Sequence, residues 1–180
     1  GCCASRRTAD GIYEPSCIAR CLAVKRTTDY TPRPFDAVAT GGGKVLVVAT
    51  DNGRLTTQNG KVFASGNHPV ETLLPLMDFQ RAGLEIEFAT VSGEPVVLEM
   101  WAFPDKDAAV TTFYNKIKPK LEAPTRLDDV DPTLAGYAGI FVPGGHGAMV
   151  NLPDSVALGR LLRAAHDQAL PTVVLCHGPA

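Results

Sequence analysis

The sequence has little cysteine outside its first 21 residues, and it contains no long apolar run. Four of its five cysteines fall in that first stretch, so Cys176 is the only thiol of the rest of the chain. This clustering argues against a core held by disulfides and favours a reducing compartment. No apolar run reaches the length of a membrane span, and no apolar segment follows the N-terminus. We therefore expect no transmembrane helix and no secretory signal, and we predict a cytoplasmic protein.

The chain also lacks an excess of charge of either sign. Its 17 basic and 19 acidic residues give a net charge of −2 and an isoelectric point near 6.1, which predicts no general attraction to nucleic acid. Of its 180 residues 45% are hydrophobic. That is enough for one globular domain with a sizeable core.

Residues 1–43 are weakly patterned and end in three consecutive glycines. We predict an N-terminal arm over 1–43, flexible or acylated, and a single domain over 44–180. Cys17 and Cys21 have no histidine or second cysteine pair close by that would complete a metal site.

The first residues fit a lipidation pattern. If an initiator methionine has been removed, Gly1 with Ser5 matches the N-myristoylation motif, and Cys2 and Cys3 would be palmitoylation sites. Such a double signal would tether the chain to a membrane. A glycine left by a cleaved tag, or an unmodified arm, explains the same residues.

From residue 44 the hydrophobic pattern predicts strands that alternate with helices. Continuous apolar runs predict buried strands at 45–49, 86–91, 140–143 and 171–175, and apolar residues at helical spacing predict helices at 69–83, 107–120 and 156–169. Residues 51–61 are typical of a polar loop, and 96–101 of a hairpin or an edge strand. The alternation implies an α/β fold: an open, mostly parallel sheet with helices on both faces and a site at the carboxyl ends of its strands.

Cys176 follows the last predicted strand and is itself followed by His177 and Gly178. A tight turn at such a strand end can present a nucleophilic sulfur at the edge of the sheet. A buried core cysteine explains the same residues equally well.

Two further features are expected at this edge. Gly144 and Gly145 follow a strand, so their N–H groups can point into a concavity and bind an oxyanion. Glu71, in the first turn of a helix, can hydrogen-bond a thiol and move its proton, although such a glutamate is usually only a partner of the helix dipole. His146 lies beside the two glycines and would line the site, whereas we expect His68 to be a cap or loop residue rather than a catalyst, with Asn67 or His68 near the helix cap.

Four motifs resemble a known family. Residues 141–147 (FVPGGHG) and 175–179 (LCHGP) resemble the PfpI-type superfamily, which is related to the class I glutamine amidotransferase domains. Residues 66–76 (GNHPVETLLPL) and 100–107 (MWAFPDKD) resemble its branch of heat-shock chaperones, glyoxalase III enzymes and protein deglycases. The resemblance runs from about residue 44 to residue 180, and it implies a flavodoxin-like fold that is incomplete at its C-terminus.

The resemblance also implies a site and a reaction. Cys176 would be the nucleophile, Glu71 the acid that holds its thiol, and His177 the histidine of a Cys-His-Asp arrangement, while Gly144, Gly145 and His146 would bind the oxyanion and substrate. The implied activity is the cofactor-free conversion of methylglyoxal to D-lactate, with the same addition chemistry on glycated groups. Branch members are also described as homodimers and as holdase chaperones for unfolded clients.

Other activities of the wider superfamily fit less well. Val174 stands where a glutaminase elbow would have glycine, and nothing in the sequence shapes the groove of a peptidase.

Two departures from the family pattern matter. The branch has a metal site of two histidines and one glutamate, and the matching positions here are Gln80, Glu85 and Ile117, so we expect no metal. The chain also stops directly after the elbow, before the family's next helix, further strands and triad aspartate. We therefore expect a higher thiol pKa, an exposed last strand and a chain that is poorly active and aggregation-prone.

Overall fold

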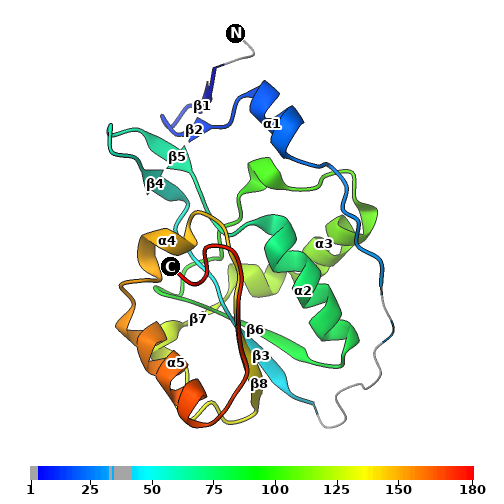
Figure 1. The fold of residues 1–180 in the computed structure, drawn as a ribbon, viewed down its shortest axis with the longest axis vertical. Coiled ribbons are helices and arrows are strands. Elements are labelled where there is room, and N and C mark those ends of the chain that lie inside the picture. Colours follow the sequence, from blue (N-terminus) through cyan, green and yellow to red (C-terminus); the bar gives the residue numbers. More distant parts are fainter. Residues whose placement is uncertain (1–3, 33, 35–41) are drawn as a thin grey trace.

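The computed structural model describes residues 4–32, 34 and 42–180. Its centre is a five-stranded sheet in the order β7–β6–β3–β8–β9 (Figure 1). The strands are β3 (Lys44–Val48), β6 (Glu85–Thr90), β7 (Thr125–Arg126), β8 (Tyr137–Val142) and β9 (Thr172–Val174). Every pairing in this sheet is parallel, so the carboxyl ends of its strands meet at one edge. The predicted α/β fold with a parallel sheet is confirmed.

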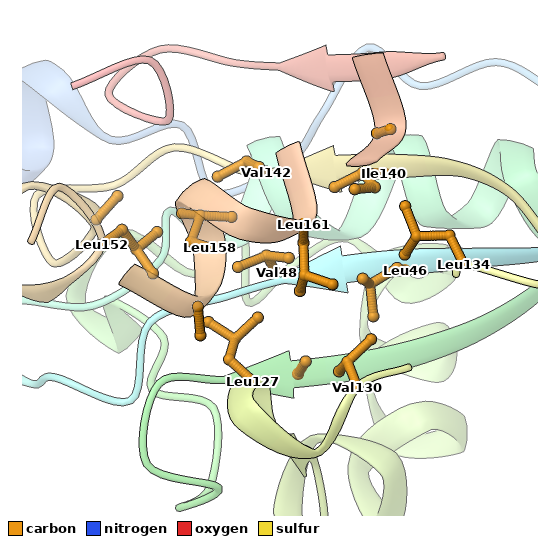
Figure 2. Close-up of a cluster of buried hydrophobic side chains, with 14 residues drawn as sticks. Leu46, Val48, Leu127, Val130, Leu134, Ile140, Val142, Leu152, Leu158 and Leu161 are labelled. Atoms are coloured by element: carbon orange, nitrogen blue, oxygen red, sulfur yellow. The ribbon is translucent and has the colours of Figure 1, made fainter. Parts of the chain in front are cut away.

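Helices cover both faces of the sheet, as Figure 1 shows. Helices α2 (Pro69–Arg81) and α3 (Ala108–Glu122) pack on one face, and α5 (Val156–Asp167) packs on the other. Successive side chains of β3 point to opposite faces of the sheet and so belong to two separate core clusters. Val45 and Val47 pack towards α2 and α3, whereas Leu46 and Val48 pack towards α5 (Figure 2). Because both faces of this strand are buried, its sequence is a continuous apolar run.

Side-chain caps fix where the helices begin. His68 Nδ1 accepts the backbone N–H of Glu71 at the start of α2 (3.5 Å), Asp107 caps α3 through Val110 N (3.1 Å), and Ser155 caps α5 through Leu158 N (3.2 Å). The predicted helix starts are therefore confirmed.

Two segments differ from their predictions. Residues 51–61, expected to be a loop, contain β4 (Arg54–Thr56), which pairs with β5 (Val62–Ala64). These strands join β1 (Arg6–Arg7) and β2 (Tyr13–Glu14) in a second, small sheet. Residues 96–101 form no hairpin: Leu98 makes one isolated bridge with Asn67, and a short 3-10 helix, η1 (Met100–Ala102), follows. The reason is that backbone groups of residues 97–99 bond Thr50 and Asn67 rather than a partner strand.

The arm has structure where it is described. It contains a short helix, α1 (Cys17–Ala23), and then runs along the outside of α2 and α3 (Figure 1). Carboxylates of the domain hold it: Thr28 donates from its hydroxyl (2.6 Å) and its N–H (2.9 Å) to Asp107, and the Tyr30 hydroxyl donates to Asp78 (2.7 Å). The predicted acylation sites Gly1, Cys2 and Cys3 lie outside the described residues.

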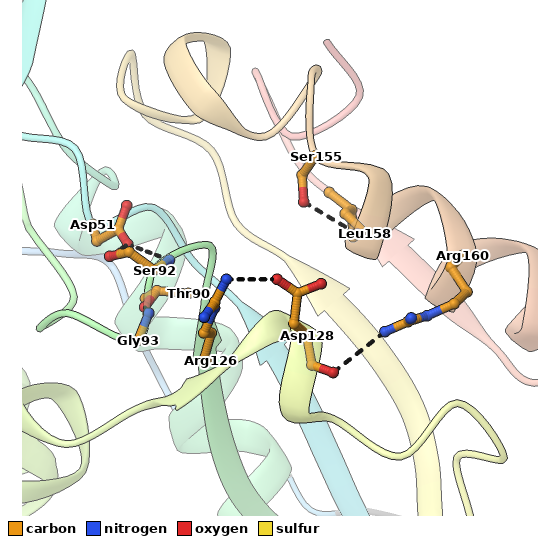
Figure 3. A network of polar contacts seen from close by, with 9 residues as sticks. All are labelled: Asp51, Thr90, Ser92, Gly93, Arg126, Asp128, Ser155, Leu158 and Arg160. Carbon is orange, nitrogen blue, oxygen red and sulfur yellow. Dashed lines mark hydrogen bonds and ion pairs between the residues drawn. The ribbon is translucent and has the colours of Figure 1, made fainter.

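Polar contacts tie together the loops at the carboxyl edge (Figure 3). Asp51, after β3, accepts hydrogen bonds from the N–H (2.9 Å) and hydroxyl (2.5 Å) of Ser92, after β6. Arg126 pairs with Asp128 (3.0 Å) in the 3-10 helix η2 (Leu127–Asp129), and Arg160 of α5 donates to the Asp128 carbonyl (3.4 Å). These bonds connect the loops that follow β3, β6 and β7 with α5.

The last strand lies at the edge of the sheet, where it pairs with β8. Its side chains are exposed: Val173 by 48% and Val174 by 42%, with Leu175 after it at 36%. The prediction of a buried strand from its apolar run is therefore wrong, because within the described chain it has a neighbour on one side only. The exposure agrees with the expectation of an exposed last strand.

Candidate active site

Cys176 lies on a strained turn directly after β9. Its φ of +53° is in the left-handed region, which a non-glycine residue rarely adopts. Two backbone hydrogen bonds hold this turn, from Leu175 N to Val142 O (3.1 Å) and from Gly178 N to Leu175 O (2.8 Å). The turn presents the thiol at the carboxyl edge of the sheet, and the cysteine is exposed rather than part of the core.

Glu71 reaches this thiol from the first turn of α2, across the space that Gly144 leaves open. A Cβ added at Gly144 would overlap Glu71 Oε2 and would come within 2.5 Å of Cys176 Cβ. The Oε2 atom is buried and has no hydrogen-bond partner among the described residues. The structure thus brings Glu71, Gly144 and Cys176 together, with one carboxylate oxygen free to accept a proton.

The surroundings of Cys176 act on its thiol in opposite directions. Burial raises the pKa of the thiol most, and the Glu71 carboxylate raises it further by its charge and by hydrogen bonding. The backbone amides of Gly145 and His177 lower the pKa, but the net direction is upward. His177 Nδ1 also lies 3.2 Å from Cys176 Sγ. The thiol is therefore mostly protonated at neutral pH.

Gly145 packs so closely against the start of α2 that no other residue fits. Its φ is +111°, and an added Cβ would overlap His68 N and Gly66 O. His68 N donates to the carbonyl of Gly144 (2.9 Å). This bond fixes the peptide that precedes Gly145, whose own N–H acts on the thiol. The expected oxyanion donor is thus held next to the candidate nucleophile.

Glu99 is a site residue that the sequence analysis missed. Its side chain is 1% exposed, and Oε1 accepts the N–H of His146 (3.0 Å) and lies 2.7 Å from His146 Nδ1. The hydrogen bond to Glu99 raises the pKa of His146, burial opposes it, and the charges of Glu99 and Glu71 raise it further. The signal was a single glutamate within the apolar stretch of residues 96–103.

A cavity of about 720 Å³ adjoins these residues. One wall contains His68, Trp101 and His146, and the arm from Ala23 to Tyr30 forms the opposite wall. The rings of Phe63 and Trp101 flank His146, with centroids at 6.2 and 6.3 Å. Neither Cys176 nor Glu71 lines this cavity, so it adjoins the site through His68 and His146.

Comparison with known proteins decides the family. Residues 61–180 match the model of the DJ-1/PfpI family. The chain belongs to the DJ-1/PfpI family.

Two curated relatives within the DJ-1/PfpI family are named protein/nucleic acid deglycase HchA. The chain is 45% identical to the protein from Pseudomonas aeruginosa over 157 residues, which cover 85% of this chain and 54% of the relative. It is also 45% identical to an Escherichia coli protein over 155 residues, covering 84% and 53%. The chain therefore spans about half the length of the curated relatives that it matches.

A solved structure of the same fold is glyoxalase III from Candida albicans. It aligns with a TM-score of 0.64 and 24% identity, covering 77% of this chain and 59% of that one. This likeness shows the fold of the DJ-1/PfpI chain. Among the described residues, no helix has both the length and the apolar character needed to cross a bilayer.

The positions that match the metal site of the DJ-1/PfpI branch do not fit a transition metal. Gln80 Oε1 accepts a hydrogen bond from Lys116 Nζ (2.8 Å), Ile117 is buried in the core, and Glu85 is exposed. Within the described ranges no group of three or more His, Cys, Asp or Glu side chains is placed to hold a metal ion.

Proposed function

We propose that Cys176 is the nucleophile of a glyoxalase III-type reaction, in which methylglyoxal and water become D-lactate. The thiolate adds to the aldehyde carbon to form a hemithioacetal, and a proton then moves through an enediol state to give a thioester that water hydrolyses. The single observation that carries the proposal is the approach of Glu71, whose Oε2 atom is buried and without a hydrogen-bond partner among the described residues, to a thiol on a positive-φ turn.

The same addition chemistry extends to adducts on glycated groups. The two curated relatives are named deglycases of protein and nucleic acid, and at 45% identity they support this part of the proposal.

The raised thiol pKa predicts a slow enzyme. The thiolate is the reactive form, so a thiol that is mostly protonated at neutral pH presents little nucleophile. We therefore propose that turnover is slow at neutral pH.

The test compares D-lactate formation from methylglyoxal by the wild-type chain and by Cys176→Ala. We expect the product with the wild type only, and we expect Cys21→Ala to behave as wild type because that thiol lies exposed on α1. Equal D-lactate formation by wild type and Cys176→Ala would overturn the proposal.

A second candidate function, holdase activity, rests on the exposed apolar edge of β9. Val173, Val174 and Leu175 form a continuous exposed apolar run beside an unpaired strand edge. A holdase would suppress aggregation of an unfolded client in the Cys176→Ala variant as well as in wild type. Val173→Lys should abolish that suppression, whereas Val156→Lys, at an exposed site on α5, should not.

We also propose that the protein works in the cytoplasm as a homodimer, as the family likeness implies. Light scattering coupled to gel filtration tests the dimer, and mass spectrometry of protein from the native host tests acylation of Gly1, Cys2 and Cys3. A monomeric mass would refute the first part, and an unmodified N-terminus would exclude the membrane tether.

A further inference from the structure

Glu99 is the most buried charged side chain of the described residues, and its charge faces a single partner. Oε1 accepts the His146 N–H (3.0 Å) and contacts His146 Nδ1 (2.7 Å). Oε2 is buried and has no partner among the described residues. A buried carboxylate without other donors is stable mainly as one half of an ion pair. Glu99 therefore favours the imidazolium form of His146.

The position of the His146 ring directs its other nitrogen away from Glu99. Because Nδ1 faces Glu99, Nε2 lies on the opposite edge of the ring, and in the described part of the chain it has no hydrogen-bond partner. The side chain is 39% exposed and lines the 720 Å³ cavity. Its ring centroid is 5.2 Å from that of His177, whose Nδ1 lies 3.2 Å from Cys176 Sγ. The ring of His146 thus packs against the histidine that contacts the candidate nucleophile.

We propose that His146 is a second proton-carrying residue of this site, positioned by Glu99, and that it moves a proton between the two oxygens of the bound substrate. The proposal rests on the glyoxalase III-type function proposed above. In this scheme Glu71 moves the proton on carbon. His146, which the Glu99 carboxylate positions, moves the protons on the two oxygens.

In the hemithioacetal on Cys176, Glu71 removes the proton from the former aldehyde carbon, and that electron pair forms the carbon–carbon double bond. The ketone oxygen gains the displaced pair and takes the proton from His146 Nε2. The hydroxyl of the hemithioacetal then returns a proton to Nε2, its carbon becomes the thioester carbonyl, and Glu71 delivers its proton to the neighbouring carbon. Glu71 and His146 end in their starting states.

Several charged or titratable groups surround His146. Glu99 precedes η1, Glu71 and His68 come from the start of α2, Cys176 and His177 follow β9, and Lys25 and Asp29 of the arm lie across the cavity. The hydrogen bond to Glu99 has the largest effect and raises the pKa of His146 above its ordinary value of 6.5. His146 must be protonated to donate, so the proton transfer that follows hemithioacetal formation should slow as the pH rises through this raised pKa. The growing thiolate fraction acts in the opposite direction, on the addition step.

The experiment combines kinetics with a histidine titration by NMR. The chain has four histidines, so each imidazole signal can be assigned from its own substitution. We compare wild type, His146→Gln, Glu99→Gln and Cys176→Ala, with His166→Gln on the exposed side of α5 as the matched control. His146→Gln should lower kcat by about 10²–10⁴-fold with little change in KM, because a general acid is lost.

Glu99→Gln keeps an acceptor oxygen for His146 but removes the charge. We expect the pKa of His146 in the NMR titration, and the basic limb of kcat, to move to lower pH together, while His166 titrates as before. An unchanged His146 titration in Glu99→Gln, or wild-type kcat in His146→Gln, would overturn this inference but not the proposed function. Equal D-lactate formation by wild type and Cys176→Ala would instead overturn the proposed function, and this inference with it.

Discussion

The Glu71 carboxylate and the Cys176 thiol lie together in the site, and the carboxylate raises the pKa of the thiol, although burial raises it more. Replacing Glu71 by Gln keeps the shape and removes the charge. The pKa of the thiol should then fall, so alkylation of Cys176 by iodoacetamide at neutral pH should become faster. Turnover should nevertheless drop by about 10²–10⁴-fold, since an amide cannot take the substrate proton.

The opposite signs of these two effects make the prediction specific to Glu71. The control is Glu94→Gln, because Glu94 lies exposed in the loop after β6 and should change neither rate. Slower alkylation in Glu71→Gln, or turnover equal to wild type, would show that this carboxylate does not act on the thiol.

Gly144→Ala should inactivate the site without unfolding the chain. The added methyl group would overlap Glu71 Oε2 and approach Cys176 Cβ, so one of these two groups must move. A displacement of about 1 Å at reacting groups costs on the order of 10²-fold in rate. The measurement is kcat for methylglyoxal, with circular dichroism to verify the fold.

Gly159→Ala is the matched control for this substitution. Gly159 lies within α5, and an added methyl group would meet no atom within 4 Å. Activity should be unchanged, and stability should rise by up to about 1 kcal/mol because alanine favours a helix. Equal activity of the two alanine variants would contradict the close approach at Gly144.

Much of the domain could be predicted from sequence because its signals are local. A strand buried on both faces is an apolar run, as in β3, and a helix start carries its own cap, as His68, Asp107 and Ser155 do. These signals were sufficient for β3, β6, β8 and β9 and for α2, α3 and α5, but not for β7 or for the strands of the small sheet. The roles of Cys176 and Glu71 remain predictions, which the variants above test.

The features that sequence analysis missed depend on contacts between distant segments. Glu99 is defined by His146, which is 47 residues away, and no pattern around either residue indicates the pair. Likewise, residues 97–99 are extended but pair with no strand, because Asn67 and Thr50 take up their backbone groups. The exposure of β9 depends on the absence of a second neighbour in the described sheet, which its apolar sequence does not reveal.

Asn67→Ala should destabilise the whole edge of the sheet. The fully buried Asn67 accepts the N–H of Thr50 (3.1 Å) and donates to the carbonyls of Thr50 (2.9 Å) and Val97 (2.8 Å). Removing the amide leaves a buried N–H without a partner, which with the other lost bonds should cost about 2–4 kcal/mol. Urea unfolding measures this cost.

The control for Asn67 is Asn59→Ala in the exposed turn between β4 and β5. There the side chain bonds Thr57 and Lys61 at the surface, so water can replace it and the cost should stay below about 1 kcal/mol. Similar urea midpoints for both variants would show that the hydrogen bonds of Asn67 to Thr50 and Val97 do not stabilise the fold.

Asp107 should make the attachment of the arm sensitive to acid. Its pKa is lowered mainly by the Thr28 hydroxyl, against the effect of burial, and further by the N–H groups of Val110 and Thr28. A carboxylate whose folded pKa lies below its ordinary 3.8 stabilises the fold above that pH, and this contribution disappears as the pH falls through the folded pKa. Cleavage of the arm near Leu22 and Tyr30 by pepsin, which is active in acid, should therefore accelerate as the pH falls through this pKa and before the domain unfolds.

Asp107→Asn isolates this contribution. At neutral pH it should cost about 0.5–2 kcal/mol as a weakened helix cap, while the loss of urea stability between about pH 6 and about pH 2.5 should become smaller than in wild type. Glu87, Asp105 and Asp131, whose pKa values are also lowered, should maintain the remaining acid dependence. The control is Asp154→Asn at an exposed position, which should leave the loss of stability with falling pH unchanged. If Asp107→Asn lost as much stability with falling pH as wild type does, protonation of Asp107 would not contribute to the acid dependence.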